Sequence, residues 1–165
     1  LTGEIPYQIE NLSNLEEIEL QNNQLTGEIP YQIENLSNLE DLYLHDNQLT
    51  GEIPYAIGNL LNLKKLYLHD NQLIGGIPSS IWENTTLSES NYSYSVANNQ
   101  LTDLGENICT FTGSHEYIVF TPITYPPSGS YHTDYANSLE NNKFCPPYPE
   151  CVENYVGEQD TSNCP

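Results

Sequence analysis

A unit of 24 residues recurs along the first half of the chain, and this repeat limits the folds that are open to it. The unit that begins at Leu12 reads LSNLEEIELQNNQLTGEIPYQIEN, and the units that begin at Leu36 and Leu60 keep its pattern. A repeat of this length cannot bury its own apolar side chains, so successive units have to stack. The sequence therefore predicts a solenoid with one continuous core.

Each fixed position of the unit has a structural role. Alternating apolar and polar residues predict a short strand with one face turned inward, and the stacked strands should form a parallel sheet. The inward residues are Ile18, Leu20, Leu42, Leu44, Leu66 and Leu68. An asparagine follows each strand, where its amide can satisfy the backbone of neighbouring coils. These asparagines are Asn23, Asn47 and Asn71. The glycine later in the unit permits close approach of the backbone. The proline that follows it prevents a regular helix.

The pattern LxxLxxLxLxxNxLTGxIPxxIxN covers residues 1–84 and resembles the plant-type leucine-rich repeat. That class occurs in plant receptor-kinase ectodomains, polygalacturonase-inhibiting proteins and some bacterial secreted proteins. The resemblance implies an α/β-type repeat solenoid of about five to six coils. It also implies a concave parallel sheet, a second short sheet from the LTGxIP segment, and a disulfide-bonded C-terminal cap.

Two later segments keep the strand pattern but follow insertions. Residues 94–101 come 28 positions after the preceding strand, and residues 137–144 come another 43 positions later. We therefore predict leucine-rich repeats over residues 1–112, an aromatic and Pro-rich insertion over 113–135, and a last strand with a cysteine-containing cap over 136–165. The first coil has no matching cap, which favours a chain truncated at this end.

Four cysteines lie in the C-terminal part and predict two disulfides and an oxidising compartment. They are Cys109, Cys145, Cys151 and Cys164. Three pairings are open, of which Cys109–Cys145 with Cys151–Cys164 is favoured. A zinc site is disfavoured because the spacing lacks a close Cys-x2-Cys pair.

The charge balance excludes some partners. Lysine and arginine together number only 3, against 23 acidic residues, which gives a net charge of -20. Binding to nucleic-acid phosphates needs clustered cations, so a nucleic-acid partner is excluded. No apolar run approaches the length of a membrane span. We expect an extracellular or cell-surface protein. The charge favours solubility above all, with cationic partners or a salty or calcium-containing medium as the alternatives.

The outward residues of the strands form the candidate ligand-binding face, because concave surfaces are where solenoids usually bind. Tyr43 and Tyr67 should be neighbours on one exposed face, and so should His45 and His69, since each pair is one repeat apart. The candidate residues are Glu19, Asp41, Tyr43, His45, Lys65, Tyr67 and His69. Recent duplication of the repeat is the alternative explanation of these matching residues.

Other features support weaker alternatives. A metal between His45 and His69, with Asp46 or Asp70 nearby, lacks a fixed third ligand, so we predict no metal and no cofactor. The row of Thr2, Thr26 and Thr50 resembles an ice-binding face, but the row is broken in the next coil. Tyr7, Tyr31 and Tyr55 form a second stripe, expected on the convex side.

Asn84 and Asn91 are candidate glycosylation sites. No catalytic motif is present, so an enzyme is not expected. The most favoured function is non-enzymatic recognition of a protein, peptide or glycan through the concave sheet. The alternative is a structural or adhesive unit of a cell-surface layer or filament that self-associates end to end through its open first coil.

Overall fold

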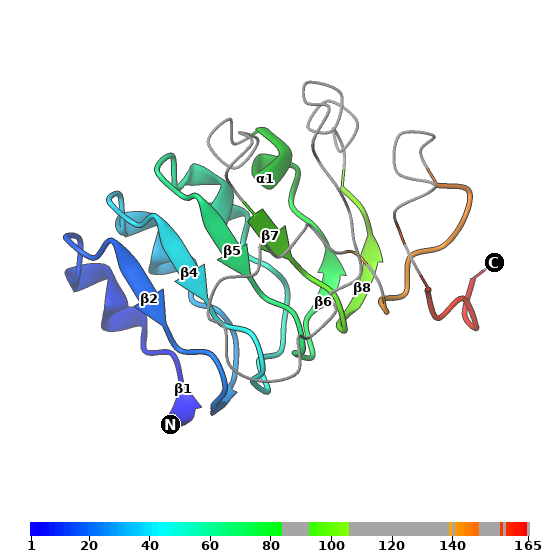
Figure 1. Ribbon diagram of the computed structural model, residues 1–165, viewed down its shortest axis with the longest axis horizontal. Coiled ribbons are helices and arrows are strands. Elements are labelled where there is room, and N and C mark those ends of the chain that lie inside the picture. Colours follow the sequence, from blue (N-terminus) through cyan, green and yellow to red (C-terminus); the bar gives the residue numbers. More distant parts are fainter. Residues whose placement is uncertain (84–92, 106–138, 140, 149–155, 157, 165) are drawn as a thin grey trace, which may run out of the picture.

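The computed structural model describes residues 1–83, 93–105, 139, 141–148, 156 and 158–164. Coils stack side by side from the N-terminal end to the C-terminal end of the molecule (Figure 1). Up to Glu83, strands lie on one side of the coils and short helical turns on the other (Figure 1). The leucine-rich repeat solenoid predicted from the sequence is confirmed.

The concave face is a four-stranded parallel sheet in the order β2-β4-β5-β7. Its strands are β2 (Glu17–Glu19), β4 (Asp41–Tyr43), β5 (Lys65–Tyr67) and β7 (Ser93–Ser95). The register joins each residue to its equivalent in the next unit, for example Tyr43 to Tyr67. The register continues into the next coil, where Tyr67 pairs with Ser95. The four extra residues between these two strands therefore do not shift the pairing.

A second set of strands comes from the LTGxIP segments. Parallel pairs form between β1 (Thr2–Glu4) and β3 (Gln24–Thr26), and between β6 (Ile74–Gly76) and β8 (Gln100–Asp103). Single bridges, Glu28 to Thr50 and Glu52 to Ile74, continue this pairing through the middle coils. The second short sheet implied by the resemblance is therefore present, although it is interrupted.

The convex side carries the 3-10 helices η1 (Tyr7–Asn11), η2 (Tyr31–Asn35) and η3 (Tyr55–Asn59), followed by the α-helix α1 (Ser79–Glu83). A proline in extended conformation precedes each 3-10 helix. Leucine and isoleucine side chains from every coil fill the space between the two layers, and those of Leu36, Leu39 and Leu42 are completely buried. The core therefore runs through all described coils.

The repeated asparagine forms a hydrogen-bonded ladder along the solenoid, as predicted. The Asn47 side chain accepts a hydrogen bond from the amide of Leu25 in the preceding coil at 3.0 Å. It donates to the carbonyl oxygens of Leu20 and Leu44 at 2.9 and 3.1 Å. Asn71 and Asn99 repeat these contacts one coil and two coils further on.

The ladder continues across the longest insertion and into the cap. Asn142 accepts from the amide of Leu101 and donates to the carbonyl oxygen of Val96, so its coil stacks directly on the coil of Asn99. Gln159 takes the same role one step later. Its amide contacts the carbonyl oxygens of Leu139 and Val156, and its oxygen accepts from the amide of Phe144. The cap thus ends the solenoid with a glutamine in place of the asparagine.

The structure corrects the favoured disulfide pairing. Cys145 is bonded to Cys164, with 5.5 Å between their Cα atoms. Gln159 stacks on Asn142, and this contact brings the end of the cap against the residue that follows Phe144. Neither Cys109–Cys145 nor Cys151–Cys164 can form with that bond in place. Cys109 and Cys151 lie outside the described residues.

The predicted insertion, residues 113–135, also lies outside the described residues, so the domain boundaries stay predictions. Within the part of the chain that the structure describes, no helix has the length and apolar character needed to cross a bilayer.

Candidate functional site

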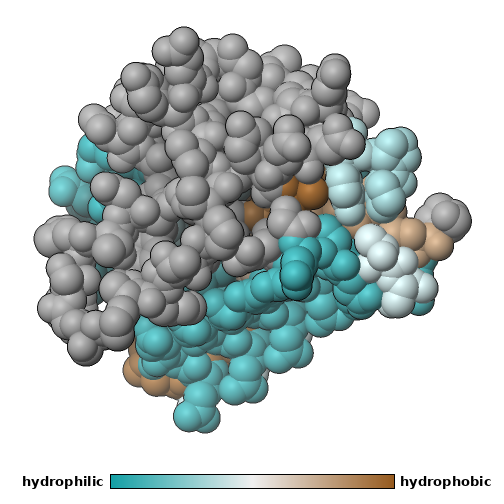
Figure 2. Space-filling view, turned by 45° about the vertical axis from the view of Figure 1, so that its right-hand side comes forward, coloured by the Kyte–Doolittle hydropathy of each residue, from teal (hydrophilic) through white to brown (hydrophobic). Residues whose placement is uncertain are grey.

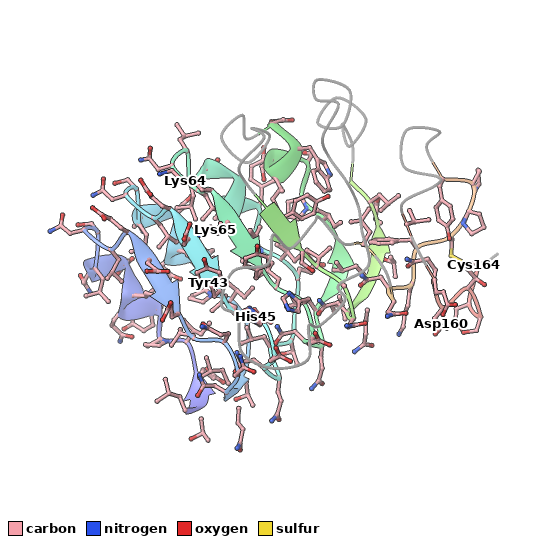
Figure 3. The ribbon with its side chains drawn as sticks, viewed as in Figure 1. Tyr43, His45, Lys64, Lys65, Asp160 and Cys164 are labelled. Carbon is pink, nitrogen blue, oxygen red and sulfur yellow. A yellow bond between two sulfur atoms is a disulfide. The ribbon has the colours of Figure 1, made fainter. Side chains whose placement is uncertain are left out.

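The outward side chains of the concave sheet form three rows that run across the strands. The middle row contains Glu19, Tyr43, Tyr67 and Ser95. Next to it run Gln21, His45, His69 and Ala97, which follow the same strands. Tyr43, His45 and Lys65 lie together in Figure 3, on the strands of neighbouring coils. The repeat spacing places each of these residues beside its equivalent, as the sequence predicted.

Tyr43 and Tyr67 are stacked on one another. Their ring centroids are 5.3 Å apart and the ring planes differ by 14°. Offset stacking of this kind adds about 0.5–1.5 kcal/mol to the stability that burial alone gives. The pair is therefore a preformed aromatic surface on a rigid sheet.

A polar cluster holds the Tyr43 hydroxyl in place. Lys65 donates from Nζ to Asp41 Oδ2 at 2.8 Å and to the Tyr43 hydroxyl at 3.0 Å, and this hydroxyl donates to the same carboxylate at 3.1 Å. The hydrogen bond to Asp41 is the main reason that the pKa of Lys65 lies above its usual value. Burial is the main reason that the pKa of Tyr43 is raised. Lys65 is therefore charged and Tyr43 neutral at pH 7.

His45 and His69 form a second stack beside the tyrosines, with ring centroids 4.4 Å apart and planes that differ by 15°. Each histidine also meets Tyr67 edge-on, at 5.9 Å. Burial lowers the pKa of His45, although the carboxylate of Asp70 opposes this shift. Burial, with a smaller contribution from His45, lowers the pKa of His69 to about 3. Both rings are therefore neutral at pH 7.

The low pKa of His69 predicts a loss of stability in mild acid. The unfolded chain takes up a proton near the ordinary pKa of 6.5, whereas the folded chain does so only near 3. This contribution to stability is complete above pH 6.5 and falls as the pH drops toward 3. Each pH unit in that window costs about 1.4 kcal/mol, so about 2 kcal/mol is lost between pH 7 and pH 5.

Urea unfolding at pH 7 and pH 5, with chelator present, measures this loss. The matched variant His69→Gln has no proton to gain at this position, so its stability should change by about 2 kcal/mol less over the same interval. An equal change in both proteins would contradict the assignment of the loss to His69.

Exposure falls along the concave face from its first strand to its last. Glu17 and Glu19 on β2 are exposed, while Asp41, Tyr43 and His45 are half-buried. Tyr67 is only 4% exposed and His69 only 2%. The prediction that the two Tyr–His pairs are neighbours is confirmed, but the prediction that both pairs are exposed is wrong for Tyr67 and His69. The repeat spacing fixes which residues are adjacent and carries no information on what lies over them.

Other predicted features lie outside the concave face. The convex tyrosines Tyr7, Tyr31 and Tyr55 are 57%, 66% and 58% exposed, as expected for that stripe. Asn84 and Asn91 lie outside the described residues, so their glycosylation stays a prediction. The described surface in Figure 2 is largely hydrophilic, in keeping with the 23 acidic residues of the chain.

The structure adds one residue, Asp46, beside the histidine row and shows an unsatisfied atom on Gln21 within it. Asp46 provides the third ligand atom that the sequence could not place, because its carboxylate and the two histidines lie within 4.8 Å of one another. Gln21 contributes a buried amide oxygen that accepts no hydrogen bond from the described residues. The only sequence signal for Gln21 is its position, 24 residues before His45. The signal is weak because this unit has a glutamine where the next two have a histidine.

Comparison with known proteins agrees with this architecture. Residues 13–73 match the model of the leucine-rich repeat family. The search of curated proteins gave no match. Among solved structures, the ectodomain of the receptor kinase SOBIR1 from Arabidopsis thaliana is similar at 36% identity and a TM-score of 0.60. That similarity covers 67% of this chain and 59% of the SOBIR1 chain.

Two further structures show the range of the similarity. The Arabidopsis receptor kinase HAESA, solved with the peptide hormone IDA and the co-receptor SERK1, has 26% identity and a TM-score of 0.64 over 87% of this chain. A plant ice-binding protein has 36% identity and a TM-score of 0.57 over 62% of this chain. The chain spans 20% of the HAESA chain and 32% of the ice-binding protein, so it corresponds to a part of each.

Proposed function

Because this chain is a leucine-rich repeat protein of the plant type, similar to receptor-kinase ectodomains, we propose that it is an extracellular recognition module without enzymatic activity. It binds a protein or a peptide through the open part of the concave sheet. The observation that carries the proposal is the Tyr43 cluster, in which Lys65, Asp41 and the stacked Tyr67 hold one half-exposed aromatic ring in a fixed position.

A rigid aromatic ring favours binding because little conformational entropy is lost on contact. Tyrosine also offers both an apolar ring and a hydroxyl group, which is why it is common in binding surfaces. The stacked geometry exists before any ligand arrives. HAESA was solved with a peptide hormone, and this similarity supports a peptide or protein ligand for the present chain.

The charge around Tyr43 indicates a basic partner. Glu17 and Glu19 on β2 are exposed, and the described residues offer neither of them an ion pair. Lys64, directly before β5, and Lys65 on β5 are already paired with Glu40 and Asp41. The open end of the face is therefore acidic, and a peptide with Lys or Arg beside an apolar residue would complement it.

A peptide-display selection tests the proposal with the folded chain as bait and random peptides as probes. Selected peptides are expected to be rich in Lys and Arg. The double variant Tyr43→Ser, Glu19→Gln should bind them about 10- to 30-fold more weakly, as expected for a central aromatic contact with a neighbouring charge.

The matched control is Tyr31→Ser, which removes an exposed tyrosine from the convex side. Its affinity for the selected peptides should equal that of the original chain. Loss of binding in Tyr31→Ser, with retention in the concave variant, would move the site to the convex stripe. If the chain binds glycans on an array and no peptide, the ligand is a glycan and the proposed peptide or protein ligand is wrong.

End-to-end assembly is the second candidate function. It is supported by apolar surface on the first coil, where Leu1 is 73% and Leu12 52% exposed. Stacking of a second chain would cover these side chains, as successive coils do within the solenoid. Light scattering at several concentrations separates the two candidates. Growth with concentration supports assembly, and a constant monomer mass counts against it.

A further inference from the structure

We propose that His45, His69 and Asp46 form a binding site for a divalent transition metal of the zinc class on the concave face. One ligand atom from each residue lies within 4.8 Å of the other two. The two histidines follow neighbouring strands, and their rings are stacked with centroids 4.4 Å apart. Asp46 comes directly after His45 in a turn of left-handed backbone, with φ 56°.

The ligand set determines the class of metal. Imidazole nitrogen with a carboxylate oxygen suits zinc and its neighbours, whereas calcium and magnesium prefer oxygen ligands alone. Bonds of about 2.0–2.2 Å in a tetrahedron place ligand atoms about 3.3–3.6 Å apart. Small side-chain rotations suffice to close a separation of 4.8 Å to this value. Two histidines and one carboxylate leave the fourth position to water or to a ligand.

Unsatisfied polar atoms in the same row provide a second, independent observation. Gln21 Oε1 and His45 Nδ1 are buried, and neither forms a hydrogen bond with the described residues. Gln21 and His45 stand at the same place in successive coils, since β2 pairs with β4 in register. A buried polar atom without a partner costs about 1–3 kcal/mol. A metal bound to His45 would remove this cost at the nitrogen.

The charges at the end of the row also favour a cation. Asp46 and Asp70 occupy equivalent positions in successive coils, and both precede a ladder asparagine. Asp70 accepts a hydrogen bond from Asn98. Asp46 forms no ion pair with a lysine among the described residues. Because Asp46 and Asp70 carry like charges in neighbouring coils, a divalent cation bound to Asp46 would relieve their repulsion.

Access to the site comes from one side. His45 and Asp46 are half-buried, whereas His69, stacked beside His45, is only 2% exposed. A metal would therefore reach the site past His45 and Asp46, the two ligands that stay partly exposed. The metal site does not depend on the proposed recognition function, because it involves neither Tyr43 nor the carboxylates of β2.

Titration of the full oxidised chain with zinc tests the inference by calorimetry, after removal of bound metal by chelator. One zinc ion per chain is expected. His45→Gln and Asp46→Asn should each weaken binding by about tenfold or more. Glu28→Gln changes an exposed carboxylate far from the row and should leave the affinity unchanged. The other two histidines, His115 and His132, lie outside the described residues, and the double variant His115→Gln, His132→Gln should bind zinc as the original chain does.

A measurement on the unaltered chain covers the case in which a variant folds poorly. Imidazole nitrogen resonances recorded with and without zinc should shift for two of the 4 histidines, His45 and His69. Cobalt should give the visible absorption of a tetrahedral site with nitrogen and oxygen ligands. The inference is overturned by an absence of binding, by unchanged affinity in a folded His45→Gln protein, or by a thiolate-to-cobalt absorption band, which would place the metal at cysteines.

Discussion

Replacement of Asn99 by alanine is expected to lower the free energy of unfolding by about 3 kcal/mol. The Asn99 side chain is 7% exposed, accepts from the amide of Leu73 at 3.0 Å and donates to the carbonyl oxygens of Leu68, Val96 and Ala97. Those carbonyls keep other donors, whereas the N–H of Leu73 has no other acceptor among the described residues. A buried N–H without a partner costs about 1–3 kcal/mol, and the lost bonds and the cavity add to it.

Denaturant unfolding of Asn99→Ala beside Asn59→Ala measures this effect. Asn59 is exposed and makes one side-chain hydrogen bond, to Glu34 at 3.3 Å, so its loss should cost about 0.5 kcal/mol or less. Equal losses in the two variants would show that the ladder contributes no more than a surface amide.

Gly58→Glu is expected to destabilise the protein by about 3 kcal/mol even though it restores the residue of the earlier repeats. Glu10 and Glu34 occupy the matching positions in η1 and η2. At Gly58, however, an added Cβ would lie 2.3 Å from the Cβ and 2.4 Å from the carbonyl carbon of Ser80. Ser80 belongs to α1 and is fixed by a hydrogen bond from its hydroxyl to the carbonyl oxygen of Tyr55 at 2.8 Å.

Thermal and denaturant unfolding test this prediction through a short series. Gly58→Ala should cost less than Gly58→Glu. Adding Ser80→Gly should recover part of the loss, because it removes two of the three clashing atoms, the Cβ and the Oγ of Ser80. The reverse change, Glu34→Gly, affects an exposed residue of η2 and should cost about 1 kcal/mol or less. A stabilised Gly58→Glu protein would show that α1 can move away from η3.

These two variants differ in how far the sequence predicts them. The importance of the ladder asparagine follows from the repeat alone, because the same residue recurs where each strand ends. The clash at Gly58 does not follow, because it depends on how α1 packs against η3. Replacing Gly58 by the glutamate that the earlier repeats have at this position would therefore destabilise the protein.

The candidate site shows the same division. The repeat period predicted that Tyr43 stacks beside Tyr67 and that His45 stacks beside His69. It did not predict that Tyr67 and His69 are buried, nor that Asp46 completes a group of three ligand atoms. Burial depends on the whole chain, and the position of Asp46 depends on a turn whose backbone the pattern does not specify.

The sequence by itself determined the solenoid, the strand register and the asparagine ladder, because each is a contact between equivalent positions one period apart. The tertiary structure alone decided the bond between Cys145 and Cys164 and the role of Gln159 as the last step of the ladder. These contacts join segments that follow insertions, where the period no longer relates one coil to the next. Such pairings depend on how the chain closes the end of its core.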